Sequence, residues 1–340
     1  MGHPPLERNA VKFQTPICRL DRAALFAALL FAVLFPHACS AQTNEQRSLV
    51  LVIGAAGEPD YAEQFSHWAD LWKAAAIKGG LQTSVIGEDL NQPTNDRVRL
   101  LTVLTNEVAK PGGELWLVFL GHGTYDGRSA KFNLRGPDLS AADLAAVLKP
   151  CQRPLAVIQC ASASGPFINA LSGPNRVIVT ATRSGYEVNA TRFGGYLAQA
   201  IADPAADLDK DGQTSLLEAF LLASREVAQF YKETGRLATE HPLLDDNGDG
   251  LGTPPDWFQG VRAVKTAAGG KAVDGVRAHQ FHLVRSATEQ ELSPAARARR
   301  DELEKQLSTL RARKENLTSD EYYQQLEVIL VQIARLYQTK

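Results

Sequence analysis

A histidine follows directly after an apolar run of strand length. Residues 114–120 read Glu-Leu-Trp-Leu-Val-Phe-Leu, and the run ends in Gly121-His122-Gly123. A second apolar run, residues 154–159, ends in small and nucleophilic residues that include Cys160 and Ser162. Ligands and chemistry collect at the carboxyl ends of neighbouring strands in an open α/β sheet. An imidazole on one strand end and a thiol or hydroxyl on the next would form a nucleophile–base pair.

The cysteines bear on which side chain is the nucleophile. The sequence has 4 cysteines, and Cys18 and Cys39 lie in a predicted leader. If residues 154–159 form a strand, Cys151 and Cys160 are separated by roughly 20 Å or more. A disulfide requires α-carbons within about 7 Å, so these two cysteines should not pair. Cys160 is therefore either a reactive thiol or a small buried apolar residue.

Strand-like and helix-like stretches alternate through most of the chain. Strands are expected at 49–53, 82–86, 114–120, 154–159 and 176–180, and helices lie between them and after residues 193 and 216. This alternation predicts an α/β fold with a mainly parallel sheet and helices on both faces. The turn Gly54-Ala-Ala-Gly57 lacks the complete glycine spacing of a dinucleotide-binding loop, so nucleotide binding is not expected.

Composition and the amino-terminal segment indicate export. The 340 residues carry a formal net charge of −2 and are 44% hydrophobic, which fits a globular protein and gives no sign of nucleic-acid binding. Basic residues, the apolar segment 23–35 and small residues at 39–41 predict a signal peptide over residues 1–41. We expect a periplasmic or extracellular protein with no membrane span after leader removal. A retained anchor and lipid attachment at Cys39 are the alternatives.

The carboxyl-terminal segment, residues 290–340, predicts a helical hairpin with coiled-coil character. Ser293-Pro294 is a typical helix start, and Thr318 with Glu321 resembles a capping box that opens a second helix. Apolar residues follow at helical spacing in both segments. The hairpin either packs on the domain or binds a partner.

The segment 207–218 matches the calcium-loop template, with oxygen ligands at alternating positions, glycine at the sixth and glutamate at the twelfth. A second segment, 245–256, repeats the opening of the loop, but its twelfth residue is the shorter Asp256 after two prolines. We expect structural calcium, held by Asp207, Asp209, Asp211, Gln213, Ser215, Glu218, Asp245, Asn247 and Asp249.

Residues 48–260 resemble the caspase/legumain-like cysteine peptidases, within a domain expected at 48–285. The strand into Gly121-His122-Gly123 is similar to the His-Gly motif of that family. The strand ending at Cys160-Ala-Ser-Ala-Ser-Gly165 is similar to its nucleophile strand, and Val177–Ser184 to the strand lining the primary pocket. The resemblance implies a thiol protease with a His122–Cys160 dyad, an oxyanion site at the Gly123 amide, and a protein or peptide substrate.

The sequence departs from the family at the nucleophile. Aligned on Ser164-Gly165, the family's cysteine position falls on Ser162, and Cys160 misses it from the other direction by one residue. Three outcomes stay open. Cys160 reaches the site, Ser162 acts as a weak nucleophile, or the domain is inactive and serves as a protein-binding or scaffold module.

Overall fold

The computed structural model describes residues 1–2, 46–89 and 95–338. The helices and strands of the described residues lie in one compact unit, Glu45–Lys340. The predicted signal peptide, with Cys18 and Cys39, falls outside the described residues except for residues 1–2. Among the described residues, no helix is both long and apolar enough to cross a membrane.

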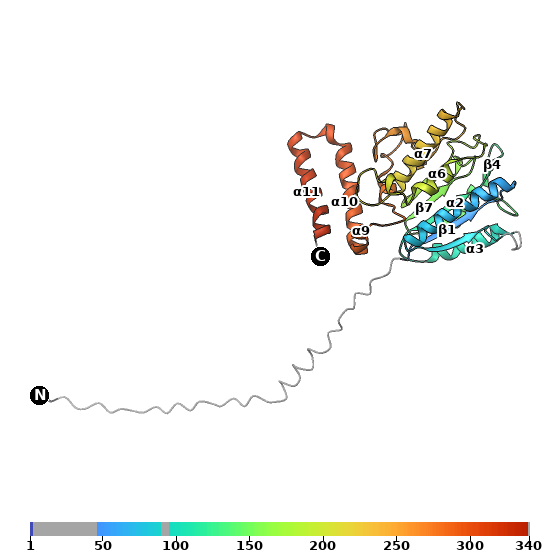
Figure 1. The fold of residues 1–340 in the computed structure, drawn as a ribbon. Helices are drawn as coiled ribbons and strands as arrows, with labels where there is room; N and C mark the ends of the chain where they lie inside the picture. Colours follow the sequence, from blue (N-terminus) through green and yellow to red (C-terminus); the bar gives the residue numbers. More distant parts are fainter. Residues whose placement is uncertain (3–45, 90–94, 339–340) are drawn as a thin grey trace. The chain divides into compact units, whose positions relative to one another are not determined.

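The core of the molecule is a six-stranded sheet with the order β2-β1-β3-β7-β8-β9 (Figure 1). The first five strands run parallel, and β9 pairs antiparallel with β8. The mainly parallel sheet predicted from the sequence is therefore confirmed. The strands are β1 (Ser48–Ile53), β2 (Gln82–Ile86), β3 (Leu115–Leu120), β7 (Leu155–Gln159), β8 (Arg176–Thr180) and β9 (Leu243–Asp245).

Helices cover both faces of the sheet, as expected for a parallel sheet. One face packs on α2 (Pro59–Lys78), α6 (Phe193–Ala200) and α7 (Leu216–Glu233). The opposite face packs on α3 (Asp96–Ala109), α4 (Ala141–Leu148) and α5 (Pro166–Leu171). The central strands β1, β3 and β7 are almost entirely apolar because both of their faces are buried.

Side-chain caps fix where several helices begin. Ser140 and Asp143 form a capping box at the start of α4, and Ser215 and Glu218 form another at the start of α7. Thr318 and Glu321 exchange the same hydrogen bonds before α11, so this predicted helix start is confirmed.

The sequence did not predict the small elements around the sheet. A three-stranded antiparallel sheet of β4, β5 and β6 follows His122, and β10 pairs with β11 further along the chain. Each is too short to show a periodic pattern. They are β4 (Gly123–Tyr125), β5 (Ala130–Phe132), β6 (Leu139–Ser140), β10 (Phe258–Gln259), β11 (Arg262–Ala263), the 3₁₀ turns η1 (Pro204–Ala206), η2 (Pro255–Trp257) and η3 (Lys314–Asn316), and the short helices α8 (Val276–Gln280) and α9 (Ala287–Glu291).

The predicted carboxyl-terminal hairpin consists of α10 (Pro294–Ala312) and α11 (Ser319–Gln338). The two helices share an apolar cluster around Leu303, Leu310 and Ile329. Arg300 of α10 pairs with Glu289 of α9, and Glu304 accepts a hydrogen bond of 2.9 Å from Gln280 of α8. The hairpin is thus joined to the sheet domain through α8 and α9.

Candidate functional site

The two strands that carry the candidate residues are neighbours. β3 and β7 pair in parallel with Phe119 opposite Gln159. Both chains leave the sheet at the same edge, so His122 and Ser162 follow at equivalent positions. β3 and β7 are therefore the two neighbouring strands between whose carboxyl ends the sequence predicts a crevice.

Ser162 lies against the backbone of Gly123. Its hydroxyl donates to the Gly123 carbonyl at 3.0 Å and accepts from the Gly123 amide at 3.2 Å. Ser162 is 3% exposed. A β-carbon on residue 123 would lie 2.3 Å from the Ser162 carbonyl oxygen, so only glycine fits there. The hydroxyl and the amide predicted to serve catalysis therefore satisfy each other.

The turn after Ser162 is tightly held. Ala163 has a φ of 54°, in the left-handed region that non-glycine residues seldom adopt. Its amide donates to the Glu187 carbonyl at 2.8 Å. The hydroxyls of Ser164 and Thr182 share a hydrogen bond of 3.1 Å. The exit of β7 is therefore tied to the chain that follows β8.

His122 is half-buried among aromatic rings of α2. Its ring makes edge contacts with Tyr61 and Phe65, with centroids 4.5 and 5.2 Å apart. Burial lowers the pKa of His122 from its ordinary value, against a hydrogen bond to the Ala56 backbone and the charge of Glu58. The imidazole is thus held mainly neutral by its surroundings.

Cys160 points into the core on the face of the sheet that α2 and α6 cover. It is 1% exposed and belongs to the apolar cluster with Trp68 and Phe193. A β-carbon on Gly194 would lie 2.8 Å from the β-carbon of Cys160, which shows how closely α6 approaches it. Burial raises the pKa of the thiol far above its ordinary value, with a further increase from the charge of Glu240. Cys151 and Cys160 are both free thiols.

Exposed apolar side chains lie beside the Ser162 turn. Tyr186 is 77% exposed and Val188 is 60% exposed. The Tyr186 ring contacts Tyr125 edge-on at 5.2 Å, and Gly185 lies directly against the Tyr125 ring. These side chains come from β4 and from the segment after β8, which the Glu187 carbonyl joins to the turn.

Two further polar residues meet at Glu187. Arg183 is exposed and pairs with Glu187 at 3.2 Å. The Nδ1 atom of His241 lies 2.6 Å from the same carboxylate. Nothing in the sequence spacing pointed to Glu187 as their common partner, because His241 lies 54 residues away along the chain.

In the first predicted calcium loop, aspartate side chains accept hydrogen bonds from backbone amides of the same loop. Asp207 accepts amide hydrogen bonds from Lys210 and Gly212, and Asp209 and Asp211 each accept one from two residues onward. The carboxylates of Asp207, Asp209 and Asp211 lie within 4.8 Å of one another. This set of oxygen atoms fits a calcium ion.

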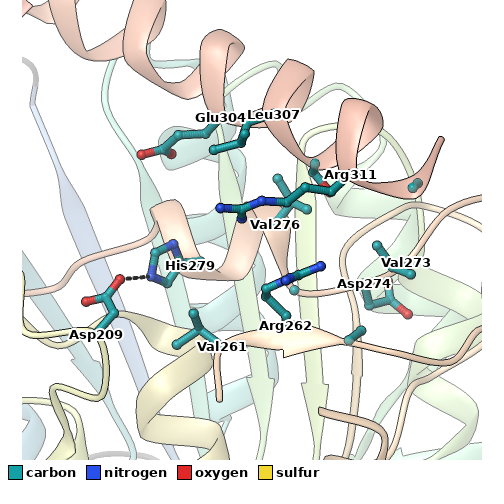
Figure 2. Close-up of a pocket in the computed structure, with 14 residues that line it drawn as sticks. Asp209, Val261, Arg262, Val273, Asp274, Val276, His279, Glu304, Leu307 and Arg311 are labelled. Carbon is teal, nitrogen blue, oxygen red and sulfur yellow. Dashed lines mark hydrogen bonds and ion pairs between the residues drawn. The ribbon is translucent and has the colours of Figure 1, made fainter. Parts of the chain in front are cut away.

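His279 of α8 joins the loop from a distant part of the sequence. Its Nε2 lies 2.9 Å from an Asp209 oxygen, and Figure 2 shows this contact at one side of a cavity. Asp209, Glu218 and His279 also bring ligand atoms within 4.8 Å of one another. The cavity has a volume of about 430 Å³ and lies between α8, β11 and α10. The 70 residues between His279 and Asp209 explain why the sequence did not link them.

The second loop repeats the turn geometry of the first. Asp245 accepts from Gly248 and Gly250, and Asn247 accepts from Asp249. Among the described residues, Asp256 is not part of a converging group of carboxylates; it lies in η2. Asp274 instead approaches the loop and accepts from the Asn247 amide at 3.1 Å.

Solved caspase structures are similar to part of this chain. No protein-family model matches the chain, and no curated protein matches its sequence. The initiator caspase Dronc of Drosophila matches with a TM-score of 0.42 and 16% identity, covering 60% of this chain and 80% of Dronc. Caspase-1 of Spodoptera frugiperda matches with a TM-score of 0.39 and 10% identity, covering 59% and 87%. Raptor of Chaetomium thermophilum matches with a TM-score of 0.33 and 10% identity, covering 46% and 18%. At these scores the likenesses carry no activity over to this chain.

Proposed function

We propose that this chain is a caspase-like domain that binds a protein or peptide and does not cleave it. The hydrogen-bond pair between Ser162 and Gly123 carries this proposal. A serine nucleophile has to pass its proton to a base, and an oxyanion needs free amide donors. Here the Ser162 hydroxyl donates its hydrogen bond to the Gly123 carbonyl, and the Gly123 amide donates its hydrogen bond to the Ser162 hydroxyl.

The other candidate nucleophile supports the same proposal. Only a thiolate is an effective nucleophile, and burial raises the pKa of Cys160. Cys160 also packs against Trp68 and Gly194 in the core, where a substrate has no room. A peptidase built on Cys160 would need the strand end to rearrange.

The proposed binding surface is the apolar rim beside the Ser162 turn, formed by Tyr125, Tyr186 and Val188. Exposed apolar patches on a protein surface commonly mark interaction sites, and tyrosine is enriched among the residues that dominate binding energy. The backbone bond from Ala163 to Glu187 keeps this rim beside the crevice.

Covalent probes test the absence of catalysis. Purified full-length protein is treated with a thiol-directed acyloxymethyl ketone and, separately, with a serine-directed fluorophosphonate. We expect no active-site labelling of the wild type by either probe. Ser162→Cys places a thiol at the family's nucleophile position, and because the native side chain is 3% exposed this variant should also stay unlabelled. Ser164→Cys, two residues away and 0% exposed at the native serine, is the matched control and should stay unlabelled.

Labelling of the wild type that is lost in His122→Ala, with an unchanged melting temperature, would contradict the proposal and establish a peptidase. A surface-displayed random peptide library then tests binding. Peptides enriched on the wild type should bind Tyr186→Ala at least ten-fold more weakly. Leu237→Ala, which also removes an exposed side chain, should bind them as the wild type does.

Calcium at the loop 207–218 is part of the proposal as a structural ion. Asp207, Asp209, Asp211, the Gln213 carbonyl, Ser215 and Glu218 would supply the oxygen atoms, and the ion would stiffen the approach to α7. Thermal melting in calcium and in chelator checks this. We expect the melting temperature to rise by several degrees with calcium, and at least part of this rise to be lost in Asp207→Asn. An equal melting temperature in both buffers would contradict calcium binding by this protein.

Calcium at the second loop would be held by Asp245, Asn247 and Asp249, and export through the leader would place both loops where free calcium is abundant. A loss of only part of the calcium-induced rise in Asp207→Asn would indicate that the second loop also binds.

A further inference from the structure

The cavity between α8, β11 and α10 has the size and lining of a small-molecule site. Its volume is about 430 Å³, which is within the range of cavities that hold small organic ligands. It shares no lining residue with the rim formed by Tyr125, Tyr186 and Val188. A ligand in this cavity would therefore bind independently of a peptide at the rim.

Two arginines on opposite walls of the cavity have no partner in the described part of the chain. Arg311 belongs to α10 and Arg262 to β11, and Figure 2 shows both side chains in the space between the helix and the strand. Neither guanidinium group forms a hydrogen bond or an ion pair with another described residue. Guanidinium groups bind the paired oxygen atoms of carboxylates and phosphates. The two walls thus offer donors for an oxyanion.

The carboxylates that line the cavity are engaged by other groups. Asp209 contacts the Nε2 atom of His279 at 2.9 Å. Glu304 accepts a hydrogen bond of 2.9 Å from the last residue of α8. Asp274 accepts hydrogen bonds from one hydroxyl and two backbone amides of the second predicted calcium loop. The charge that lacks a partner at this cavity is therefore positive.

Most of the remaining lining is aliphatic. It consists of Val261, Ala263, Val273, Val276, Leu307 and Ala312, together with Gly275 and Ser308. No aromatic ring is among the side chains that line the cavity, so the lining suits an alkyl chain better than a flat ring. Each methylene group that such a lining removes from water strengthens binding by roughly four-fold.

We propose that this cavity binds a small organic anion with an alkyl body, in which a carboxylate or phosphate group lies between Arg262 and Arg311. The alkyl part contacts the aliphatic lining on α8 and α10. Both parts of the ligand are needed, because an alcohol leaves the two guanidinium groups without an oxyanion, and a short anion leaves the aliphatic lining in water. The ligand also links α10 to β11, since each element supplies one arginine.

Titration calorimetry of the full-length protein tests the ligand class. The probes are octanoate, octyl phosphate, octanol and acetate, in buffer with a chelator so that calcium does not bind the anions. We expect octanoate or octyl phosphate to bind at least ten-fold more tightly than octanol and acetate, and the tighter of the two anions identifies the head group. Raising the salt concentration should weaken the binding of both anions. Octanol that binds as tightly as both anions would overturn the proposal, and so would the absence of any binding by either anion.

Substitutions of the arginines test the position of the head group. Arg311→Gln and Arg262→Gln should each bind the preferred anion at least ten-fold more weakly, because a charge-assisted contact is lost. Arg313→Gln is the matched control, since Arg313 is also exposed, lies two residues from Arg311 and does not line the cavity. It should bind the anion as the wild type does.

The melting temperatures of the three variants without ligand should equal that of the wild type, because no described residue pairs with the guanidinium groups of Arg262 and Arg311. This comparison separates a loss of binding from a loss of folding. Undiminished binding in both Arg311→Gln and Arg262→Gln would contradict the proposed site, as would an equal loss in Arg313→Gln.

Discussion

Backbone atoms of the β7 exit turn crowd the α-carbon of Gly123. The carbonyl oxygen of Ser162 leaves no room for a β-carbon there, and the hydroxyl of Ser162 holds the Gly123 amide and carbonyl together. A residue that looks like part of an oxyanion site is therefore a close structural contact between two strands. The glycine is required by packing whether or not the crevice has an activity.

Gly123→Ala should destabilise the protein by roughly 2–4 kcal/mol, because the backbone must move to admit the methyl group. Urea unfolding followed by circular dichroism measures the free energy. Gly173→Ala is the control, since the nearest atom to its β-carbon would be 3.8 Å away, and it should change stability by less than 1 kcal/mol. Equal stabilities of the two variants would mean that Gly123 has space the structure does not show.

Cys160 should react as a buried thiol. We expect a maleimide at neutral pH to modify it at least a hundred-fold more slowly than in urea, because it is 1% exposed and its thiolate is disfavoured. The half-buried Cys151 gives an internal comparison. Peptide mapping by mass spectrometry identifies the modified residue. Rapid modification of Cys160 in the folded protein would return it to the list of candidate nucleophiles.

At the scale of elements, most of the sheet and its helices follow from local pattern. The expected strands 82–86 and 176–180 coincide with β2 and β8, and the helix expected between the strands at 82–86 and 114–120 is α3. Apolar runs of strand length and side-chain caps are local signals, so a sequence shows them directly. The antiparallel strand β9 and the small sheet after His122 carry no such signal, because pairing with distant residues defines them.

The capping box of α4 should contribute measurably to stability. Ser140→Ala removes the acceptor of the Asp143 amide, and we expect a loss of about 1 kcal/mol. Thr318→Ala removes the equivalent acceptor before α11. Because α11 packs on α10, the loss of this cap should change the helical signal of the tail more than the unfolding of the sheet. Proteolysis that cuts both variants at the same rate and place would argue against this separation.

At the scale of the whole molecule, a buried ion-pair cluster joins three distant segments. Glu114, just before β3, contacts Arg47 near the start of β1 and Arg285 after α8, at 2.8 and 2.7 Å. Burial alone would raise the pKa of Glu114, but the two guanidinium groups outweigh it and lower the pKa to about 2. The cluster joins the segment after α8 to the amino-terminal ends of β1 and β3, which lie opposite the crevice.

Stability should therefore fall in acid through Glu114. Its folded pKa of about 2 lies below the ordinary value of 4.5, so the ionised carboxylate adds stability above pH 4.5. This contribution, about 3 kcal/mol, is lost as the pH falls from 4.5 to about 2. Urea unfolding at several pH values measures it. Glu114→Gln should lower stability at pH 7 and flatten the acid slope. Glu63→Gln, which removes an exposed carboxylate of α2, should leave the slope unchanged. The same slope in all three proteins would exclude Glu114 as its source.

The sequence by itself determined the parallel α/β sheet, the order of its strands along the chain, the helix start at Thr318, and the sheet edge at which His122 and Ser162 each follow a strand. These depend on apolar periodicity and capping, which act between residues close in the chain. The tertiary structure alone decided which way each side chain at that edge faces. It turned Cys160 into the core, bound the Ser162 hydroxyl to Gly123, and brought Glu187, His241 and His279 to partners more than 50 residues away. Such contacts depend on how strands and helices pack, and no local pattern encodes them.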